Sequence, residues 1–433
     1  MDRQLYTSEI QPETALLIGV QHSRLHEWEV RDHLEELALL CHTAGAVVVG
    51  DVVVKIGRMN SALYIGSGKA EEIAARVREE GISTVVFDDD LTPAQGRNLE
   101  KLIGTKVIDR TQVILHIFAQ HARSREGQMQ IELAQLEYLL PRLRRMWTHL
   151  ERQKGGMGMH GPGEKQLELD RRRILERIDR FRGELQDVRR HRTEQRRGRR
   201  RHGWSLVSLV GYTNAGKSTL LNALTGAEVY ADDKLFATLD PTTRQLRLSK
   251  HQQLLLTDTV GFIRKLPHGL VEAFKATLEE VAHADLLLHV IDAAHPRVEE
   301  QVAAVDAVLQ ELGVQDKPVL YVLNKMDEPD ARLRAAMLAR KYQPAVEVSA
   351  LRGEGFDALR DALADALQNR AVRAMISVPL SEARLLASIR SGAAVHSCVY
   401  EDERAIIEGS FPPRLWGSCK AYTLDPVEEV EES

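Results

Sequence analysis

The sequence is poor in the features that mark secreted, fibrous or membrane-spanning proteins. It has three cysteines in 433 residues, too few and too scattered for a disulfide framework or a metal site, so we expect a reducing compartment. No apolar run approaches the roughly 18 residues that a membrane span needs. The first residues lead into no apolar core of the signal-peptide type. These absences predict a soluble, cytoplasmic protein.

The composition is that of an ordinary globular protein. Hydrophobic residues make up 43% of the chain and charged residues 28%, which excludes a wholly disordered or collagen-like protein. The length is that of about three domains.

The net charge of −5 conceals one strongly basic segment. Residues 142–201 hold 20 Lys and Arg against 9 Asp and Glu, a local charge of +11, so −5 minus 11 leaves −16 for the rest of the chain. A basic block in an acidic protein favours a polyanionic partner such as RNA. The alternative is a solvated, arginine-rich helical face.

Three segments of the chain have α/β character, and we predict a multidomain α/β protein. Residues 1–127 alternate helices with short buried strands such as Ala15–Val20 and Thr84–Phe87, which predicts an N-terminal domain with a parallel layer. Residues 204–372 alternate strands and helices over the length of a nucleotide-binding domain with a doubly wound sheet. Residues 373–433 form a small C-terminal α+β domain.

The segment between the first two α/β domains has a different character. Residues 128–203 contain two charged helical stretches around the glycine-rich Gly155–Gly163, which cannot be helical. This pattern suggests an antiparallel helical hairpin with a glycine-rich tip. The following run, Arg196–Arg201, is interpreted as a linker.

The strongest chemical signal is the run Gly211–Ser218, an uninterrupted match to G-x-x-x-x-G-K-[ST]. It follows the apolar stretch Leu206–Val210 and opens a helix, which is the context this phosphate loop requires. Its backbone N–H groups would wrap the phosphates, helped by the helix dipole. Lys217 would reach the β- and γ-phosphates, and the Ser218 hydroxyl would ligate magnesium.

A second motif, Asn324-Lys325-Met326-Asp327, follows a buried strand and identifies the base. The Asp327 carboxylate can accept both N–H donors on the guanine edge, whereas adenine offers no matching pair, and an unpaired buried polar group discriminates strongly. Ser349 and Ala350, after the next strand, fit the loop that supports the base.

The segments between these motifs suggest two nucleotide-sensitive switches. Asp258, at a strand end, can hold magnesium through water, and the Gly261 N–H can contact the γ-phosphate. The segment 236–243 supplies the threonine of the first switch, and spacing alone leaves Thr238, Thr242 and Thr243 open. Loss of the γ-phosphate would release both segments.

These motifs together resemble a translation-factor-type GTPase of the Obg and HflX group. Further stretches narrow the resemblance to the HflX family: Tyr64–Lys69, Leu91–Gln95, Val107–Thr111, Ile117–Ala119, Gln130–Leu136, Leu140–Leu143, and Gly155–Gly163 with Glu164–Glu168. The resemblance covers about residues 10–372. It implies magnesium-dependent hydrolysis of GTP to GDP and phosphate, with Thr238 as the magnesium-contacting threonine. It also implies that the partner is the ribosome, principally its large subunit, and that stalled or idle ribosomes are separated in a stress response.

The predicted site residues fall into four groups. The GTP-binding residues are Gly211, Tyr212, Thr213, Asn214, Ala215, Gly216, Lys217, Ser218, Thr219, Phe236, Ala237, Thr238, Leu239, Asp240, Asp258, Thr259, Val260, Gly261, Asn324, Lys325, Met326, Asp327, Ser349, Ala350 and Leu351. The catalytic residues are Lys217, Thr238 and Gly261, and the magnesium ligands are Ser218, Thr238 and, through water, Asp258. The RNA contacts are Arg142, Arg144, Arg145, Arg152, Lys154, Gly156, Gly158, Arg171, Arg172 and Arg173.

Phe262 stands where many GTPases carry the glutamine that orients the attacking water. A phenyl ring can neither donate nor accept the required hydrogen bonds, so we expect slow turnover that large ribosomal subunits stimulate. Asn214 suggests that a potassium ion beside the phosphates supplies part of the missing charge.

Several alternatives stay open. The protein is expected to be a monomer, and one rival function is a passive RNA-binding or assembly factor regulated by GTP. Another is a peripheral membrane regulator that uses the basic block on anionic lipid, although the block lacks an amphipathic stripe with aromatic anchors. A second nucleotide site at Gly66–Lys69 is unsupported by the motif, because position 63 is Leu. Asp88–Asp90 is interpreted as a solvated turn.

Overall fold

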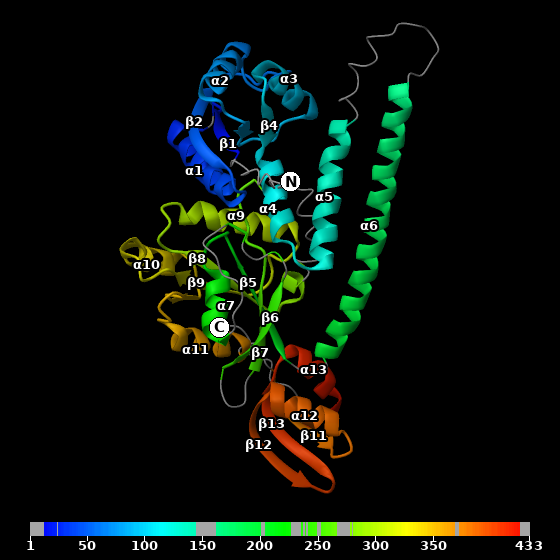
Figure 1. The fold of residues 1–433 in the computed structure, drawn as a ribbon. Helices are drawn as coiled ribbons and strands as arrows, with labels where there is room; N and C mark the ends of the chain where they lie inside the picture. Colours follow the sequence, from blue (N-terminus) through cyan, green and yellow to red (C-terminus); the bar gives the residue numbers. More distant parts are fainter. Residues whose placement is uncertain are drawn as a thin grey trace, which may run out of the picture. The chain divides into compact units, whose positions relative to one another are not determined.

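The computed structural model describes residues 13–23, 25–143, 162–200, 204–226, 235–236, 239, 241–248, 253–265, 278, 280–368 and 372–424 (Figure 1). Among these residues the chain forms two compact units, one ending at Gly183 and the other beginning at Glu184. Each unit is described by itself. The division into four segments stays a prediction.

The first unit is built on a parallel sheet in the order β2-β1-β3-β4. Its strands are β1 (Thr14–Gln21), β2 (Val47–Lys55), β3 (Thr84–Phe87) and β4 (Lys106–Asp109). Its helices are α1 (Glu27–Thr43), α2 (Ser67–Glu80), α3 (Pro93–Ile103) and α4 (Arg110–His121). Strand β1 is buried along its apolar centre, as expected of a parallel sheet that helices cover on both faces.

Two long helices follow this sheet, as the hairpin prediction expected. They are α5 (Arg125–Leu143) and α6 (Pro162–Arg200), and Figure 1 shows them side by side. Ion pairs join them, Arg177 to Glu132 and Arg182 to Glu137. Of the predicted tip Gly155–Gly163, residues 155–161 lie outside the described residues. The expectation of a non-helical segment is wrong for Pro162 and Gly163, which begin α6, because the first turn of a helix tolerates proline.

The prediction that Arg196–Arg201 is a linker is wrong for residues 196–200, which continue α6. Arginine and glutamine are good helix formers, and the single Gly198 costs only about 1 kcal/mol relative to alanine. The helix therefore runs through 39 residues, about 58 Å of rise.

The second unit contains a six-stranded sheet in the order β10-β9-β8-β5-β7-β6, in which only β6 is antiparallel to its neighbour. The strands are β5 (Ser205–Gly211), β6 (Thr242–Arg247), β7 (Gln253–Asp258), β8 (Leu286–Asp292), β9 (Val319–Asn324) and β10 (Ala345–Glu347). The helices are α7 (Lys217–Thr225), α9 (Val298–Glu311), α10 (Pro329–Lys341) and α11 (Phe356–Gln368). Apolar side chains of the central strands pack against α7 and α11 on one face. Parallel strands bring their carboxyl ends, and the motifs that follow them, to one edge.

A three-stranded antiparallel sheet in the order β11-β13-β12 completes the described chain. Its strands are β11 (Val372–Pro379), β12 (Ala394–Glu401) and β13 (Arg404–Phe411), with α12 (Ala383–Gly392), α13 (Pro413–Cys419) and the short 3₁₀ turn η2 (Lys420–Tyr422). Asp402 and Glu403 both have positive φ, the backbone of a tight two-residue hairpin turn. The multidomain α/β fold class is thus confirmed. No helix in the described part of the chain is long and apolar enough to cross a membrane.

Candidate functional site

The phosphate loop lies between the end of β5 and the start of α7, and its backbone requires glycine at two positions. Gly211 has a φ of 151° and Gly216 a φ of 92°. A Cβ at Gly211 would lie 2.3 Å from the Val290 carbonyl oxygen, and one at Gly216 would lie 2.3 Å from Asn324 Nδ2. Asn214 has a φ of 60°, a left-handed conformation that asparagine tolerates better than most residues.

Lys217 begins α7 and is buried beneath this loop. Its ammonium donates to the carbonyl oxygens of Gly211 at 3.1 Å and Tyr212 at 2.7 Å. Burial lowers the pKa of Lys217 to about 8, although the nearby Asp258 carboxylate acts in the opposite direction. Lys217 is thus a buried cation whose main partners are the dipoles of two backbone carbonyl groups. An anion that binds beside it can stabilise its charge.

Ser218 and Asp258 meet beside Lys217, although 40 residues separate them in the chain. The Ser218 hydroxyl donates to Asp258 Oδ2 at 2.6 Å, and Asp258 ends β7 in a buried position. Hydroxyl and carboxylate oxygens are the ligands that magnesium prefers, so these residues fit the predicted ion. Thr219 follows in the first turn of α7 and is half-buried.

The segment after Asp258 is hydrogen-bonded to the phosphate loop. The Thr213 N–H donates to the Phe262 carbonyl oxygen at 2.7 Å, and the Phe262 N–H donates to the Gly211 carbonyl oxygen at 3.1 Å. A Cβ at Gly261 would lie 2.8 Å from Thr213 Cα, so only glycine fits this approach. Thr259, Val260 and the Phe262 ring are all buried.

The first switch is described only in part. Phe236 is buried with a φ of 59°, and its N–H donates to Thr213 Oγ1 at 3.1 Å, which places it against the phosphate loop. Leu239 is buried. The three remaining predicted contacts, Ala237, Thr238 and Asp240, lie outside the described residues.

The other threonines of this segment belong to the sheet. Thr242 begins β6, and the Thr243 hydroxyl shares a 2.9 Å hydrogen bond with the Thr257 hydroxyl on β7. The sheet therefore engages Thr243 away from the phosphate loop.

The base-recognition motif is tied directly to the phosphate loop. Asn324 ends β9, and its Nδ2 donates to the Ala215 carbonyl oxygen at 2.8 Å. The Ala350 N–H donates to Asn324 Oδ1 at 3.0 Å. Asn324 thus fixes the phosphate loop and the base-supporting loop in one arrangement.

Two further contacts shape the base site. The Ser349 hydroxyl donates to Asp327 Oδ1 at 2.6 Å, and this bond holds the pKa of Asp327 below its usual range. The carboxylate predicted to accept the guanine N–H groups is therefore ionised at neutral pH. Met326 donates its N–H to the Val348 carbonyl oxygen, and Leu351 is exposed beside this loop.

Sequence reasoning missed Asp292, which ends β8. Its Oδ2 pairs with Lys325 Nζ at 2.6 Å and holds the lysine of the base motif. The available signal was an acidic residue at the carboxyl end of a strand that neighbours β9.

A second polar group lies at the carboxyl edge of the first sheet, where Asp109 ends β4. Its oxygens accept hydrogen bonds from Tyr138 Oη at 2.8 Å, Arg142 Nη2 at 3.0 Å, and the backbone N–H groups of Leu91 and Gln112. The Arg142 guanidinium also stacks on the Tyr138 ring, 3.4 Å from its centroid. Burial raises the pKa of Asp109, and these hydrogen bonds and Arg142 oppose that rise. We call Asp109, Tyr138 and Arg142 the Asp109 cluster.

The prediction that Arg142 contacts RNA stays a prediction, and the structure engages its guanidinium inside the first unit. Besides Asp109, its guanidinium donates to the Leu91 and Tyr138 carbonyl oxygens, so donors needed for a phosphate are engaged inside the unit. The predicted solvated turn at Asp88–Asp90 is wrong for Asp88, which is buried and pairs with buried Arg110 at 2.8 Å, whereas Asp90 is exposed.

The remaining predicted RNA contacts divide by position. Arg172 and Arg173 are 76% and 73% exposed on α6, whereas Arg171 is half-buried. The others lie outside the described residues: Arg144, Arg145, Arg152, Lys154, Gly156 and Gly158. Where the structure is described, no three His, Cys, Asp or Glu side chains are grouped to hold a metal ion.

Three sequence families match consecutive parts of the chain. They are described as "GTP-binding GTPase N-terminal" over residues 31–119, "GTP-binding GTPase Middle Region" over residues 121–199, and "50S ribosome-binding GTPase" over residues 206–325. The last match begins in β5 and ends within the Asn324–Asp327 motif.

Similar proteins extend over nearly the whole chain. GTPase HflX of Lacrimispora saccharolytica is 46% identical over 406 residues, which are 94% of this chain and 95% of the relative. GTPase HflX of Escherichia coli (strain K12) is 46% identical over 374 residues, 86% of this chain and 87% of the relative. A solved GTP-binding protein from Sulfolobus solfataricus in complex with GDP is 27% identical, with a TM-score of 0.42 over 82% of this chain and 98% of its own. The sequence relatives alone carry the assignment.

Proposed function

The chain belongs to the HflX family of GTPases, P-loop enzymes that hydrolyse GTP, and we propose that it uses this hydrolysis, with Mg²⁺, to separate stalled or idle ribosomes into subunits. The partner in this proposal is the large subunit and its RNA. The observation that carries it is the match of the catalytic domain to the family described as "50S ribosome-binding GTPase".

The arrangement of the loop supports the enzymatic part of the proposal. Lys217, whose ammonium donates to the carbonyl oxygens of Gly211 and Tyr212, would exchange these acceptors for oxygens of the β- and γ-phosphates. The Gly261 N–H would contact the γ-phosphate, and Thr238 would close the first switch over it.

The Ser218 hydroxyl and the Asp258 carboxylate would hold magnesium, Asp258 through water. The bound ion supplies positive charge that neutralises the β- and γ-phosphate oxygens. Their hydrogen bond of 2.6 Å already places both groups together on the same side of the loop.

The charge of α6 supports RNA as the partner surface. This helix carries 14 Lys and Arg against 8 Asp and Glu. Arg172 pairs with Glu176 at 2.9 Å and Arg173 approaches Asp170 at 3.6 Å. Exposed ion pairs of this kind contribute at most about 1 kcal/mol, so RNA phosphates can displace the carboxylates.

The test combines subunit dissociation with a charge reversal on α6. Purified ribosomes are mixed with the protein and GTP, GDP or a non-hydrolysable GTP analogue, and the subunits are separated by gradient sedimentation. We expect splitting with GTP, and loss of both binding and splitting in Arg172→Glu/Arg173→Glu. Arg31→Glu/Arg373→Glu is the matched control, because it also reverses two exposed, ion-paired arginines, and neither of them lies on α6.

The outcomes separate the rival functions. Binding to ribosomes without splitting in any nucleotide state would favour a passive RNA-binding or assembly factor. Flotation with anionic liposomes in place of co-sedimentation with ribosomes would favour a membrane-surface regulator.

A further inference from the structure

A cavity of about 310 Å³ opens in the first unit, at the amino-terminal edge of its parallel sheet. Its apolar wall is formed by Ala15, Val86 and Ile108 from the sheet, with Val113 from α4. The volume is at the low end of the roughly 300–1,000 Å³ of small-molecule pockets. The GTP-binding residues all lie in the other unit, so this cavity is separate from the nucleotide site.

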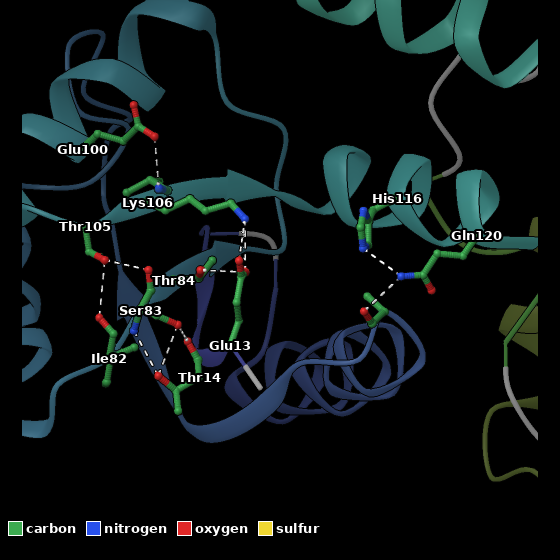
Figure 2. A network of polar contacts seen from close by, with 12 residues as sticks. Glu13, Thr14, Ile82, Ser83, Thr84, Glu100, Thr105, Lys106, His116 and Gln120 are labelled. Carbon is green, nitrogen blue, oxygen red and sulfur yellow. Dashed lines mark hydrogen bonds and ion pairs between the residues drawn. The ribbon is translucent and has the colours of Figure 1, made fainter. Parts of the chain in front are cut away.

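The strand register explains why charged groups gather at the rim of this cavity. Ala15, the second residue of β1, pairs with Thr84, and Thr84 pairs with Lys106, so the starts of three parallel strands lie side by side. Glu13 directly precedes β1, and its side chain reaches Thr84 and Lys106 (Figure 2).

Glu13 and Lys106 form an ion pair at the rim, with Glu13 Oε2 3.1 Å from Lys106 Nζ. The Thr84 hydroxyl donates to the same Glu13 oxygen at 3.3 Å and anchors the carboxylate to the sheet. The two side chains are 59% and 49% exposed, and an exposed pair of this kind is weak enough to open for a ligand.

We propose that this cavity binds a small zwitterion with an apolar side chain, the chemistry of a free hydrophobic α-amino acid. Its ammonium would pair with Glu13 and its carboxylate with Lys106, while its side chain packs against Val86, Ile108 and Val113. The rim favours this class because a zwitterion satisfies both charges at once. The Glu13 carboxylate would repel a simple anion, and the Lys106 ammonium would repel a simple cation.

His116 on α4 adds a polar side chain to the lining of the cavity. The His116 ring and the Gln120 amide lie 2.9 Å apart on α4, and the same amide reaches the Ala44 carbonyl oxygen at 3.5 Å (Figure 2). The thiol of Cys41 lines the wall from α1, and burial raises its pKa to about 12, so it contributes as a neutral group.

The test uses the full chain and measures binding of L-phenylalanine and L-leucine by calorimetry and by the shift in thermal unfolding. A ligand of this size in a site of two ion pairs should bind with a Kd on the order of 0.1–1 mM. N-acetyl-phenylalanine and phenylalanine amide, which each lack one charge, should bind at least about tenfold more weakly, because one ion pair is lost. GTP turnover without ligand should be unchanged in every variant below.

Three variants and one control test the residues themselves. Glu13→Gln and Lys106→Met should each lose amino acid binding, whereas Lys69→Met, which removes a comparable exposed pair with Glu72, should retain it. Ala46→Leu fills the cavity from its wall and should block binding without removing any charge. A cooperative unfolding transition in each variant confirms that it has folded.

Three results would overturn the proposal. They are no saturable binding of either amino acid at millimolar concentrations, equal binding of the capped derivatives, or binding of adenosine in preference to the amino acids. An amino acid complex that survives Ala46→Leu would place the ligand elsewhere and would equally rule out this cavity.

Discussion

Two polar groups lie at the carboxyl ends of parallel strands in this protein, and they use their charges in opposite ways. In the nucleotide site, the buried Lys217 ammonium donates to two backbone carbonyl oxygens, and its pKa is lowered to about 8. In the Asp109 cluster, the buried carboxylate accepts four hydrogen bonds, one of them from the Arg142 guanidinium.

The difference teaches which buried charge can serve a ligand. A buried charge whose partners are neutral dipoles is stabilised when an ion of opposite sign binds beside it. Lys217 is therefore suited to the predicted phosphate contact. A buried charge that already has an oppositely charged partner in its own chain gains no such stabilisation from a ligand. The charges of the Asp109 cluster instead join α5 to the sheet. Among buried side chains, an incompletely compensated charge therefore indicates a binding site better than charge alone.

The largest expected effect is on catalysis at Lys217. Lys217→Ala should lower GTP turnover by about 100- to 1,000-fold, because a preorganised donor to the transferring phosphate is lost. Ser218→Ala should also abolish turnover by losing a magnesium ligand. Single-turnover hydrolysis measures the effect, and Lys341→Ala, which removes an exposed ammonium paired with Glu299, is the control. Turnover within tenfold of the parent chain would contradict this role.

The next effect is on stability and concerns the Asp109 cluster. Asp109→Asn should lower the free energy of unfolding by about 2–3 kcal/mol, because Arg142 loses its carboxylate partner. GTP affinity should not change. Denaturant unfolding with a probe in the first unit measures the loss, and Asp51→Asn, at an exposed residue 4.0 Å from Arg31, is the control. A loss of GTP affinity in Asp109→Asn would mean that the Asp109 cluster is coupled to the nucleotide site.

The third effect concerns guanine recognition. Asp327→Asn should weaken GTP binding about 10- to 100-fold, because the charged acceptor of two N–H groups is lost. Binding of xanthosine triphosphate should improve, since its altered edge offers an acceptor to the new amide. Fluorescent nucleotide titration compares both ligands, with the exposed Asp357→Asn as control. Unchanged GTP affinity would remove the case for base recognition by this residue.

The fourth effect follows from the lowered pKa of Lys217. Between pH 8 and the ordinary lysine value of 10.5 the folded chain holds fewer protons than the unfolded chain, so this group adds stability as pH rises through that window. GTP binding needs the ammonium, so its affinity should fall about tenfold from pH 7 to pH 9. Lys217→Arg, which stays charged, should lose this dependence. An equal fall of GTP affinity with pH in the parent chain and in Lys217→Arg would show that Lys217 is not the group that titrates.

The smallest expected effect is potassium stimulation at Asn214. Its side chain is exposed in the phosphate loop, where the amide oxygen can help to hold a monovalent cation beside the phosphates. Turnover should be several-fold faster in potassium than in sodium, and Asn214→Ala should equalise the rates. Large ribosomal subunits should stimulate turnover in either salt. Equal rates in the two salts for the parent chain would exclude the potassium part alone.

The elements and motifs that depend on neighbouring residues could be predicted from the sequence. The run Thr84–Phe87 was predicted as a strand and is β3, because a short apolar segment between turns has few other structures available. The glycine spacing of the phosphate loop likewise specifies backbone angles, and Gly211 and Gly216 have the positive φ that this loop needs. Local patterns predict local backbone well.

Which distant side chains meet depends on the folded arrangement of strands and helices. The pairing of Arg142 with Asp109 spans 33 residues, that of Ser218 with Asp258 spans 40, and Lys325 pairs with Asp292 across neighbouring strands. Sequence reasoning placed Arg142 on an RNA surface because its charge was visible and its partner was not. The free energy of a charged group depends on what surrounds it after folding, and sheet order and helix packing determine those surroundings.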